Sequence, residues 1–301
     1  MTERATEFRE PYEVPELSAE PVSRQRGRRR VPLTLWGGSL LLSLAPIAAF
    51  VSFFWTPKDP TAQDIEQRLS SPGQNGYLLG SDGFGRDIAS QLMAGAQNSL
   101  VVGGLGVSLA LLGGITLASL AVIRSGWLEE VIMRLSDVVY AFPVVIVALI
   151  LSAKMGPGNL PGILAVAILF TPVVARLVRG SAVPLFEREF VLAARAYGRG
   201  RTYVFFRHIL PNLSALVIVQ ATVMFAIAIL LEASLSYLGL GVSPPTPSWG
   251  RMLRDAQQFL SVAPWVAVWP GLAIIVTVLG FNLTGDGLRD LADPKLHRAV
   301  R

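Results

Sequence analysis

Six apolar segments, separated by polar or charged stretches, constrain the fold of this chain more than any other feature of its sequence. A helix that crosses a bilayer needs about 20 predominantly apolar residues, and the segments approach that length. Hydrophobic residues make up 52% of the 301 residues and charged residues only 16%, whereas soluble domains carry about 25% charged residues. The sequence therefore predicts an all-α integral membrane protein with six transmembrane helices. Their predicted ranges are 33–55, 96–123, 137–153, 162–175, 212–231 and 266–282.

The distribution of basic residues predicts how these helices are oriented. Short loops rich in Lys and Arg are retained on the cytoplasmic side of a membrane. Of the 26 Lys and Arg residues, all but six lie before the first segment, after the last, between the second and third, or between the fourth and fifth. We therefore expect both termini to be cytoplasmic. The basic residues expected outside are Lys58, Arg68, Arg86, Lys154, Arg251 and Arg254.

The segments also divide the chain into five parts. Residues 1–32 are polar, and we expect a mobile cytoplasmic tail there because nothing in them can form a core. The apolar run at 33–55 is longer than the about 7–15 residues of a signal-peptide core, so it is predicted to be an uncleaved anchor. Residues 56–95 are predicted to form an extracytoplasmic loop, 96–284 a core with five further spans, and 285–301 a cytoplasmic tail.

Local patterns predict features within these parts. Asp87 can cap a helix that leads into the second span. Small residues recur every four positions in that span, as in Ala110 and Gly114, and this spacing lets membrane helices approach closely. Pro143 interrupts the third span, and Pro172 is expected to kink or locally break the fourth.

The stretch 176–211, between the fourth and fifth segments, contains seven arginines. Within it, 187–197 is predicted to be a short amphipathic helix, with Pro184 just before its start and Gly198 able to end it. Phe190, Ala194 and Tyr197 recur on one face at helical spacing. Spacing alone leaves two interpretations open, a helix that lies on the lipid surface and a helix that contacts a partner protein.

The sequence lacks the usual motifs of enzymes and of nucleotide or metal sites. None of its lysines follows a glycine, so no P-loop is present, and neither HExxH nor GxSxG occurs. With no Cys and only two His, thiolate and histidine metal clusters are excluded. The net charge of +5 would suit nucleic acid, but because the charges are segregated by loop we expect a lipid bilayer and no nucleic-acid partner.

Three acidic residues lie within or near the ends of membrane segments: Asp137, Glu232 and Asp286. Ion-coupled carriers usually place ionisable groups in the middle of their spans, so capping or hydrogen bonding between helices is favoured here. For Glu232 the alternative is a charge that faces the outside water. We treat the three as candidate structural or pathway residues.

The arginine-rich stretch resembles the EAA loop of the permease subunits of bacterial ATP-binding-cassette (ABC) importers. The matching residues are Ala193, Ala194, Gly198, Leu210 and Pro211, whereas Leu192 stands where the motif has Glu. Further motifs are similar to the dipeptide, oligopeptide and nickel branch, and to its second-permease type. They are LGSDGFGRD at 79–87, RHILPN at 207–212, EASLSYLGLG at 232–241, PPTPSWG at 244–250 and NLTGDGLRDLADP at 282–294.

The resemblance implies the type I importer permease fold in a bacterial cell membrane and a subunit that is not itself catalytic. It implies a second homologous permease, two ABC ATPase subunits (or one fused ATPase) that bind ATP and Mg, an extracytoplasmic solute-binding protein and a peptide substrate. The helix at 187–200 would couple to the ATPase. The coupling residues carried over are Glu189, Phe190, Ala193, Ala194, Arg195, Tyr197, Gly198, Arg207 and Pro211.

Alternatives remain open at this point. The same machinery could carry a nickel chelate, glutathione or haem. An ATPase-independent channel or secondary carrier, or a membrane-bound scaffold, is a more distant interpretation of the same apolar segments.

Overall fold

The computed structural model describes residues 33–292, with side chains described up to residue 291. The predicted tail at 1–32 and the residues after 292 lie outside this range. In the described part the chain is helical with no strand, apart from one isolated bridge between Ser81 and Asp87. The long helices are α1 (Leu33–Val51), α2 (Ile88–Arg124), α5 (Asn159–Leu185), α8 (Leu210–Tyr237) and α10 (Trp265–Ala292).

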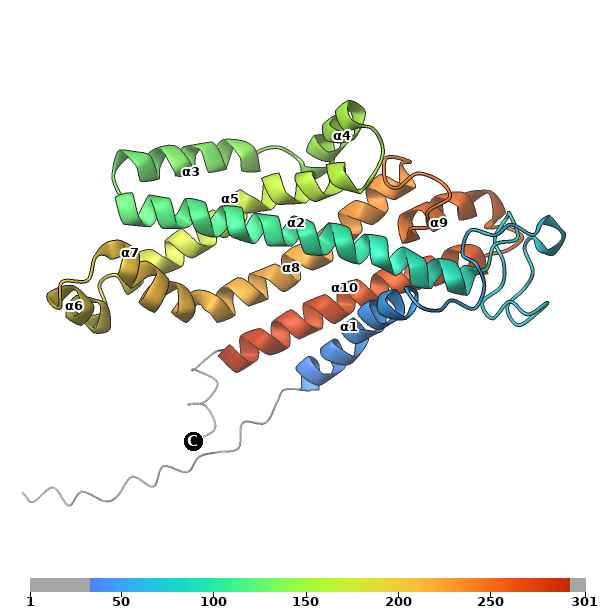
Figure 1. The fold of residues 1–301 in the computed structure, drawn as a ribbon, viewed down its shortest axis with the longest axis horizontal. Coiled ribbons are helices and arrows are strands. Elements are labelled where there is room, and N and C mark those ends of the chain that lie inside the picture. Colours follow the sequence, from blue (N-terminus) through green and yellow to red (C-terminus); the bar gives the residue numbers. More distant parts are fainter. Residues whose placement is uncertain (1–32, 293–301) are drawn as a thin grey trace, which may run out of the picture. The chain divides into compact units, whose positions relative to one another are not determined.

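The shorter helices connect the long ones in sequence. They are η1 (Ile65–Gln67), α3 (Trp127–Tyr140), α4 (Val144–Met155), α6 (Glu189–Ala196), α7 (Arg201–Val204), η2 (Phe205–Ile209), α9 (Trp249–Ala256) and η3 (Gln257–Phe259). α3 and α4 lie along one side of the bundle, and others lie at its two ends (Figure 1). We call the end that carries α6 and α7 the α6 end. The opposite end, with the loop before α2 and with α9, is the α9 end.

Five helices of the described part are long and apolar enough to cross a membrane, or six if the bent pair α3 and α4 counts as one span. α3 and α4 meet at 82°, and the break falls at Pro143, which has no backbone N–H to continue the helix. The interruption predicted there is confirmed. The predicted start of this span at Asp137 is wrong, because α3 begins at Trp127 and its first half carries charged residues that lower its hydropathy.

Several other helix ends differ from the predicted ones. α2 begins at Ile88, capped by Asp87, whose Oδ2 accepts a hydrogen bond from the backbone N–H of Ser90 at 2.8 Å. The cap is confirmed, and the loop predicted to end at 95 is shorter. α5 continues through Pro172 without a break. α10 runs to Ala292, so the tail predicted from 285 is helical at its start. Hydropathy marks the apolar part of a helix, and these helices continue into polar sequence.

Glycines and alanines bring α2 and α5 into close contact. A Cβ at Gly106 would meet the side chain of Val166 at 2.7 Å, and one at Gly114 would meet the carbonyl oxygen of Thr171 at 2.8 Å. The close approach predicted from small-residue spacing therefore falls between α2 and α5. A second seam joins α1 to α10, where Gly38 packs against the backbone at Thr284.

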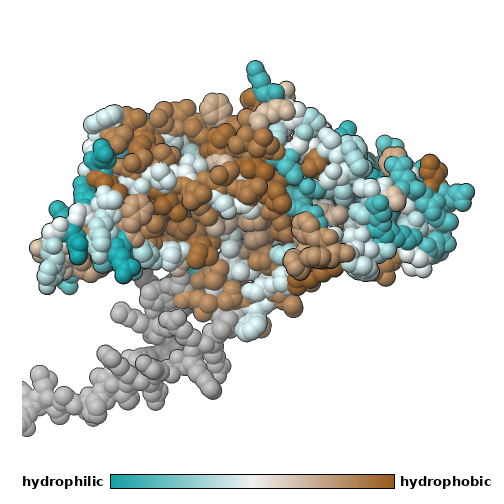
Figure 2. Space-filling model, viewed as in Figure 1, coloured by the Kyte–Doolittle hydropathy of each residue, from teal (hydrophilic) through white to brown (hydrophobic). Residues whose placement is uncertain are grey.

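On the face shown in Figure 2, exposed apolar side chains form a broad band across the middle of the bundle, and hydrophilic residues gather at its ends. Exposed apolar side chains occur on α1, α2, α3, α8 and α10, and they include Leu40, Leu44, Leu109, Leu112, Leu135, Ile218, Ile275 and Leu279. A soluble protein does not expose an apolar surface of this extent. The pattern is that of a membrane protein whose middle contacts lipid or other membrane subunits.

Candidate functional site

The helix α6, at one end of the bundle, corresponds to the coupling helix predicted from the sequence. It spans Glu189–Ala196, which is shorter at both ends than the predicted range. Pro184 precedes α6 but does not lie directly before its start, because it is part of the last turn of α5. The arginine-rich stretch is therefore not one loop: its residues before 186 continue α5, and those from 210 onward belong to α8.

One side of α6 is fixed to the protein itself. Val191 is fully buried and belongs to the same core cluster as Val204, Phe205 and Ile209, and Ala194 packs against that cluster. This corrects the predicted face of Phe190, Ala194 and Tyr197. Residues 191 and 194 are one turn apart, so the inward side of the helix is set by Val191, and Ala194 shares that side.

The other side of α6 is apolar and uncovered in the described chain. Phe190 is 42% exposed, Leu192 50% and Tyr197 86%. Ala193 and Arg195 lie on this exposed surface as well. We call Phe190, Leu192, Ala193, Arg195 and Tyr197 the α6 surface. Leu192, which replaces the Glu of the EAA motif, adds apolar area to it.

Gly198 ends this segment in a conformation that glycine favours. Its φ is +77°, in the left-handed region, where residues with a Cβ are strained. The chain then turns into α7 and the π-helical turn η2, which continue into α8, so that Arg201–Tyr237 forms one 37-residue membrane-length helix. Arg207 and Pro211 are exposed on it. Pro211 cannot donate a backbone hydrogen bond to the turn before it, and the π-helical turn lies there.

Arg201 connects the segment after α6 to two neighbouring parts of the chain. Arg201 donates a hydrogen bond to the hydroxyl of Ser125, in the turn between α2 and α3, at 3.1 Å. Its guanidinium also lies 5.4 Å from the centre of the Phe186 ring. The start of α7 is therefore tied to the α2–α3 turn and to the end of α5.

The three acidic candidates do not form one site. Asp137 on α3 pairs with Arg176 on α5 at 3.1 Å, near the surface. Asp286 is exposed on α10. Glu232 is only 3% exposed, and its carboxylate accepts hydrogen bonds from Ser99 and Ser236. The alternative that Glu232 faces the outside water is therefore wrong, because α8 continues past it and α2 covers it.

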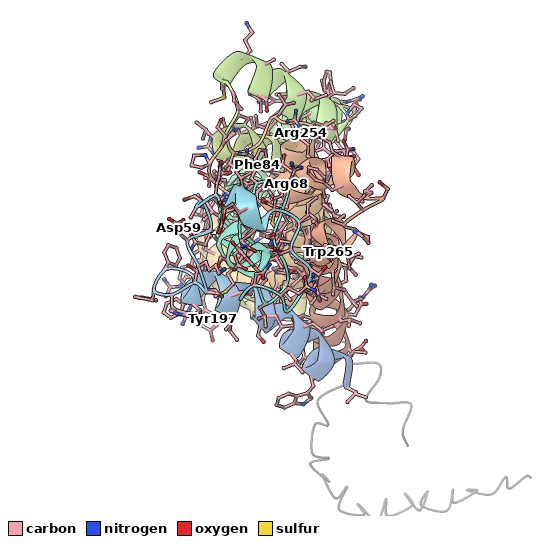
Figure 3. All side chains as sticks on the ribbon, turned by 90° about the vertical axis from the view of Figure 1, so that its right-hand side faces the viewer. Asp59, Arg68, Phe84, Tyr197, Arg254 and Trp265 are labelled. Atoms are coloured by element: carbon pink, nitrogen blue, oxygen red, sulfur yellow. The ribbon has the colours of Figure 1, made fainter. Side chains whose placement is uncertain are left out.

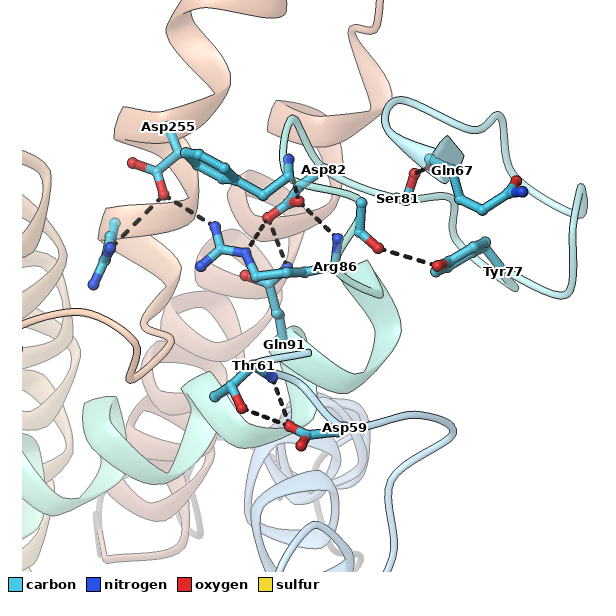
Figure 4. A network of polar contacts seen from close by, with 12 residues as sticks. Asp59, Thr61, Gln67, Tyr77, Ser81, Asp82, Arg86, Gln91 and Asp255 are labelled. Atoms are coloured by element: carbon cyan, nitrogen blue, oxygen red, sulfur yellow. Dashed lines mark hydrogen bonds and ion pairs between the residues drawn. The ribbon is translucent and has the colours of Figure 1, made fainter. Parts of the chain in front are cut away.

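A polar network at the α9 end was missed by the sequence analysis (Figure 4). Arg86 pairs with Asp82 at 2.7 Å and with Asp255 of α9 at 3.3 Å, and Gln91 donates to Asp82 at 3.0 Å. Arg251 lies 3.7 Å from Asp255, and burial lowers the pKa of its guanidinium. The pair Asp82 and Arg86 was visible as an i, i+4 spacing, but nothing local pointed to Asp255.

The outer surface of the α9 end is charged and aromatic (Figure 3). Asp59, Arg68, Phe84 and Arg254 are all exposed there. Asp59 accepts hydrogen bonds from the hydroxyl and the backbone N–H of Thr61, which lower the pKa of its carboxyl. This surface differs in character from the α6 surface, which is mainly apolar.

Known proteins resemble this chain over most of its length. Residues 110–298 match a family described as the binding-protein-dependent transport system inner membrane component. The chain belongs to this family. The permease is 38% identical to the dipeptide transport system permease protein DppC of Alkalihalophilus pseudofirmus, over 97% of this chain and 99% of the relative. It is 41% identical to the di/tripeptide permease protein DppC of Pseudomonas aeruginosa, over 88% and 89%.

A glutathione transport system permease protein, GsiD of Pectobacterium atrosepticum, is 40% identical over 86% of each chain. Among solved structures, the permease resembles a chain of the MetNI methionine ABC transporter in an inward-facing conformation, with a TM-score of 0.53 and 15% identity. That likeness covers 70% of this chain and 96% of the other. It concerns the fold alone.

These findings confirm the resemblance to ABC permeases, the all-helical importer-permease fold and the placement in a bacterial membrane with several spans. A permease of this family works in general with a second permease, an ATPase and a binding protein. The roles assigned to the coupling residues and the orientation of the termini stay predictions.

Proposed function

We propose that this permease is the transmembrane subunit of an ATP-driven importer of short peptides. It pairs with a second homologous permease to enclose the path, receives substrate from an extracytoplasmic binding protein and is driven by two ATPase subunits or one fused ATPase. ATP and Mg are held by the ATPase, and the permease itself is not catalytic. The observation that carries this proposal is the α6 surface, a mainly apolar patch on a helix whose other side packs into a buried core cluster of the protein.

The names of the relatives support short peptides as the substrate class. Two relatives are named for dipeptides or for di- and tripeptides. Glutathione is the second candidate, because a relative named for it is nearly as similar. Glutathione is itself a short peptide with one unusual linkage, so both candidates need a path of similar width whose wall tolerates ionised amino and carboxyl groups.

The basic residues support a cytoplasmic α6 end. Arginines that have no acidic partner within the described residues gather there, among them Arg124, Arg188, Arg195, Arg199 and Arg207. Positive charge close to membrane helices is retained in the cytoplasm. ATP is available on that side, so the α6 surface would face the ATPase.

In the proposed mechanism, α6 enters a cleft of the ATPase. Exposed aromatic side chains such as Phe190 and Tyr197 are suited to anchor such a contact. When ATP closes the ATPase, α6 moves with it, and its buried Val191 transfers the movement to the cluster around Phe205. α8 begins in that cluster, so a displacement of α6 reaches a helix that crosses the whole bundle.

Single cysteines test this proposal directly, since the natural chain contains none. We expect Tyr197→Cys to crosslink to the ATPase subunit in the assembled transporter and to be unreactive toward a membrane-impermeant maleimide added outside intact cells. Leu78→Cys, which is also highly exposed but lies at the α9 end, is the matched control. It should be labelled from outside and should not crosslink to the ATPase. The reverse labelling pattern would refute the proposed orientation and coupling.

A further inference from the structure

Glu232 is a buried carboxylate near the end of α8 that the proposed mechanism does not use. The hydroxyl of Ser99 on α2 donates to its Oε2 at 2.7 Å, and that of Ser236 donates to its Oε1 at 2.7 Å. The hydroxyl of Ser248, the residue just before α9, lies close to the same carboxyl group. We call Ser99, Glu232, Ser236 and Ser248 the serine-glutamate cluster. It joins α2, α8 and α9.

A carboxylate buried in a protein is destabilising unless other groups compensate for its lost hydration. Moving an acidic group out of water is costly unless it is paired or fully hydrogen-bonded, and Glu232 forms no ion pair with any residue in 33–291. Both carboxylate oxygens are occupied by serine hydroxyls, and the side chain is almost completely covered. Glu232 is therefore not placed to bind substrate. Its contacts are those of a residue that positions other elements.

The start of α9 lies next to the serine-glutamate cluster and is held by several hydrogen bonds. Ser248 caps α9 by accepting a hydrogen bond from the backbone N–H of Arg251 at 3.3 Å. Asn98 of α2 donates to the carbonyl of Pro247 at 2.7 Å, and the Trp249 indole donates to the carbonyl of Leu92 at 3.0 Å. The first turn of α9 is thus fastened to α2 on one side.

On the other side the same turn rests directly on α8. Gly250 lies against the backbone carbonyl of Ala233, so closely that a Cβ at this position would collide with it. Ala233 is the neighbour of Glu232 in sequence. The serine-glutamate cluster therefore lies beneath the point where α9 meets the bundle.

From α9 the connection continues to the loop before α2. Asp255, at the far end of α9, pairs with Arg86 of that loop, and Arg86 in turn pairs with Asp82 (Figure 4). In the other direction, α7, η2 and α8 form one continuous helix from Arg201 to Tyr237. Val204, Phe205 and Ile209, near the start of this helix, lie in the core cluster that holds Val191 of α6. One continuous helix thus connects the contact with α6 to the serine-glutamate cluster.

We propose that Glu232 is a positioning residue that fixes α9, and through it the Asp82–Arg86 loop, to α8, so that the surface of the α9 end follows the movements of the α6 end. This inference rests on the proposed function, because it requires that an ATPase moves α6. The serine-glutamate cluster then links the ATP-driven end to the end that receives the binding protein.

The test uses the complete transporter in proteoliposomes with its binding protein and peptide. In the Glu232→Ala variant, we expect the basal ATPase rate to be kept, while its stimulation by the loaded binding protein falls about tenfold, a typical size for coupling between two sites. Glu232→Gln keeps the shape and can still bond both serines, so it should assemble even if Glu232→Ala does not, and should lose less. Ser234→Ala, on the exposed side of α8 beside the cluster, is the matched control and should behave as the natural protein.

A second measurement separates positioning from a merely structural role. Leu260→Cys, exposed just after η3, is labelled with an impermeant maleimide in the resting and in the ATP-trapped transporter. The labelling rate should change between the states in the otherwise natural protein and stay constant with Glu232→Ala. Normal stimulation in Glu232→Ala, a proportional loss of basal and stimulated rates in both Glu232 variants, or a labelling rate that never changes would overturn the inference. If the natural complex shows no ATP-dependent uptake, the proposed function fails instead.

Discussion

Arg86 connects two segments that are far apart in the sequence. Its side chain is almost fully buried, and it pairs with Asp82, four residues earlier, and with Asp255, 169 residues later in the chain. Asp82 in turn accepts hydrogen bonds from the backbone N–H groups of Phe84 and Arg86. In such a buried network each charged group depends on the others, because a lone charge left inside is destabilising.

We therefore expect Arg86→Ala to destabilise the protein by about 3–5 kcal/mol, the usual effect of removing one partner from a buried ion pair. Thermal unfolding in detergent would measure the difference. Arg134→Ala is the control, because Arg134 pairs with Glu130 on the exposed surface, where such pairs contribute about 0–1 kcal/mol. Equal melting temperatures for the two variants would show that the Arg86 network does not stabilise the α9 end.

At the scale of elements, α6 owes its position to two features, the buried Val191 and the left-handed glycine at its end. A Cβ at Gly198 would meet no atom within 4 Å. A side chain at position 198 would therefore fit sterically, and what favours glycine there is the positive φ angle of the backbone. The chain direction after α6, and with it the orientation of the α6 surface, depends on that angle.

Gly198→Val should consequently leave the protein inserted and folded but uncouple ATP hydrolysis from uptake. Residues with a Cβ are disfavoured in the left-handed region by about 1–2 kcal/mol, so the turn after α6 would change. Gly200→Val is the matched control: Gly200 also has open space around it, but its φ is −70° in extended backbone, which valine adopts readily. The measurement is the ratio of transported peptide to hydrolysed ATP. A normal ratio for Gly198→Val would contradict the role of this turn.

At the scale of the whole molecule, the sequence predicted the membrane class, the family and the approximate place of each span. It predicted the Asp87 cap because capping is a local interaction, and the break at Pro143 for the same reason. It did not predict that α3 starts at Trp127, because Glu129, Glu130 and Arg134 lower the hydropathy of that segment. In the folded protein Glu129 pairs with Arg179 of α5, a contact that hydropathy does not reveal.

Several contacts of the candidate site join residues that are far apart in the sequence, so they could not be predicted from local patterns either. Ser99, which bonds Glu232, is 133 residues away in sequence, and no local pattern links the two. The sequence did not reveal which face of α6 points inward. Phe190, Ala194 and Tyr197 recur at helical spacing, but spacing alone does not show which side of a helix meets the core of the protein. Only the packing of Val191 against α7 and η2 decides which side of the helix remains free.

The large hollows of the described chain also bear on how peptide would cross the membrane. One of about 370 Å³ lies between α2, α3 and α5 and is lined almost entirely by apolar side chains, including Leu117, Ile132, Leu135 and Ile168. A path for a polar peptide needs hydrogen-bonding groups along its wall, because unpaired polar groups are costly in an apolar environment. This hollow is suited to lipid or a neighbouring apolar helix, so the chain alone offers no evident path there.

We therefore expect the purified chain, reconstituted alone in vesicles, to give no uptake of labelled dipeptide, because in the proposed importer a second permease supplies the other wall of the path. Adding the second permease, the ATPase and the binding protein should restore uptake that depends on ATP. Vesicles with the ATPase and binding protein but without the second permease are the informative control, and they should remain inactive. Dipeptide flux through the isolated chain would favour the channel or carrier interpretation, because a single subunit would then contain the whole path.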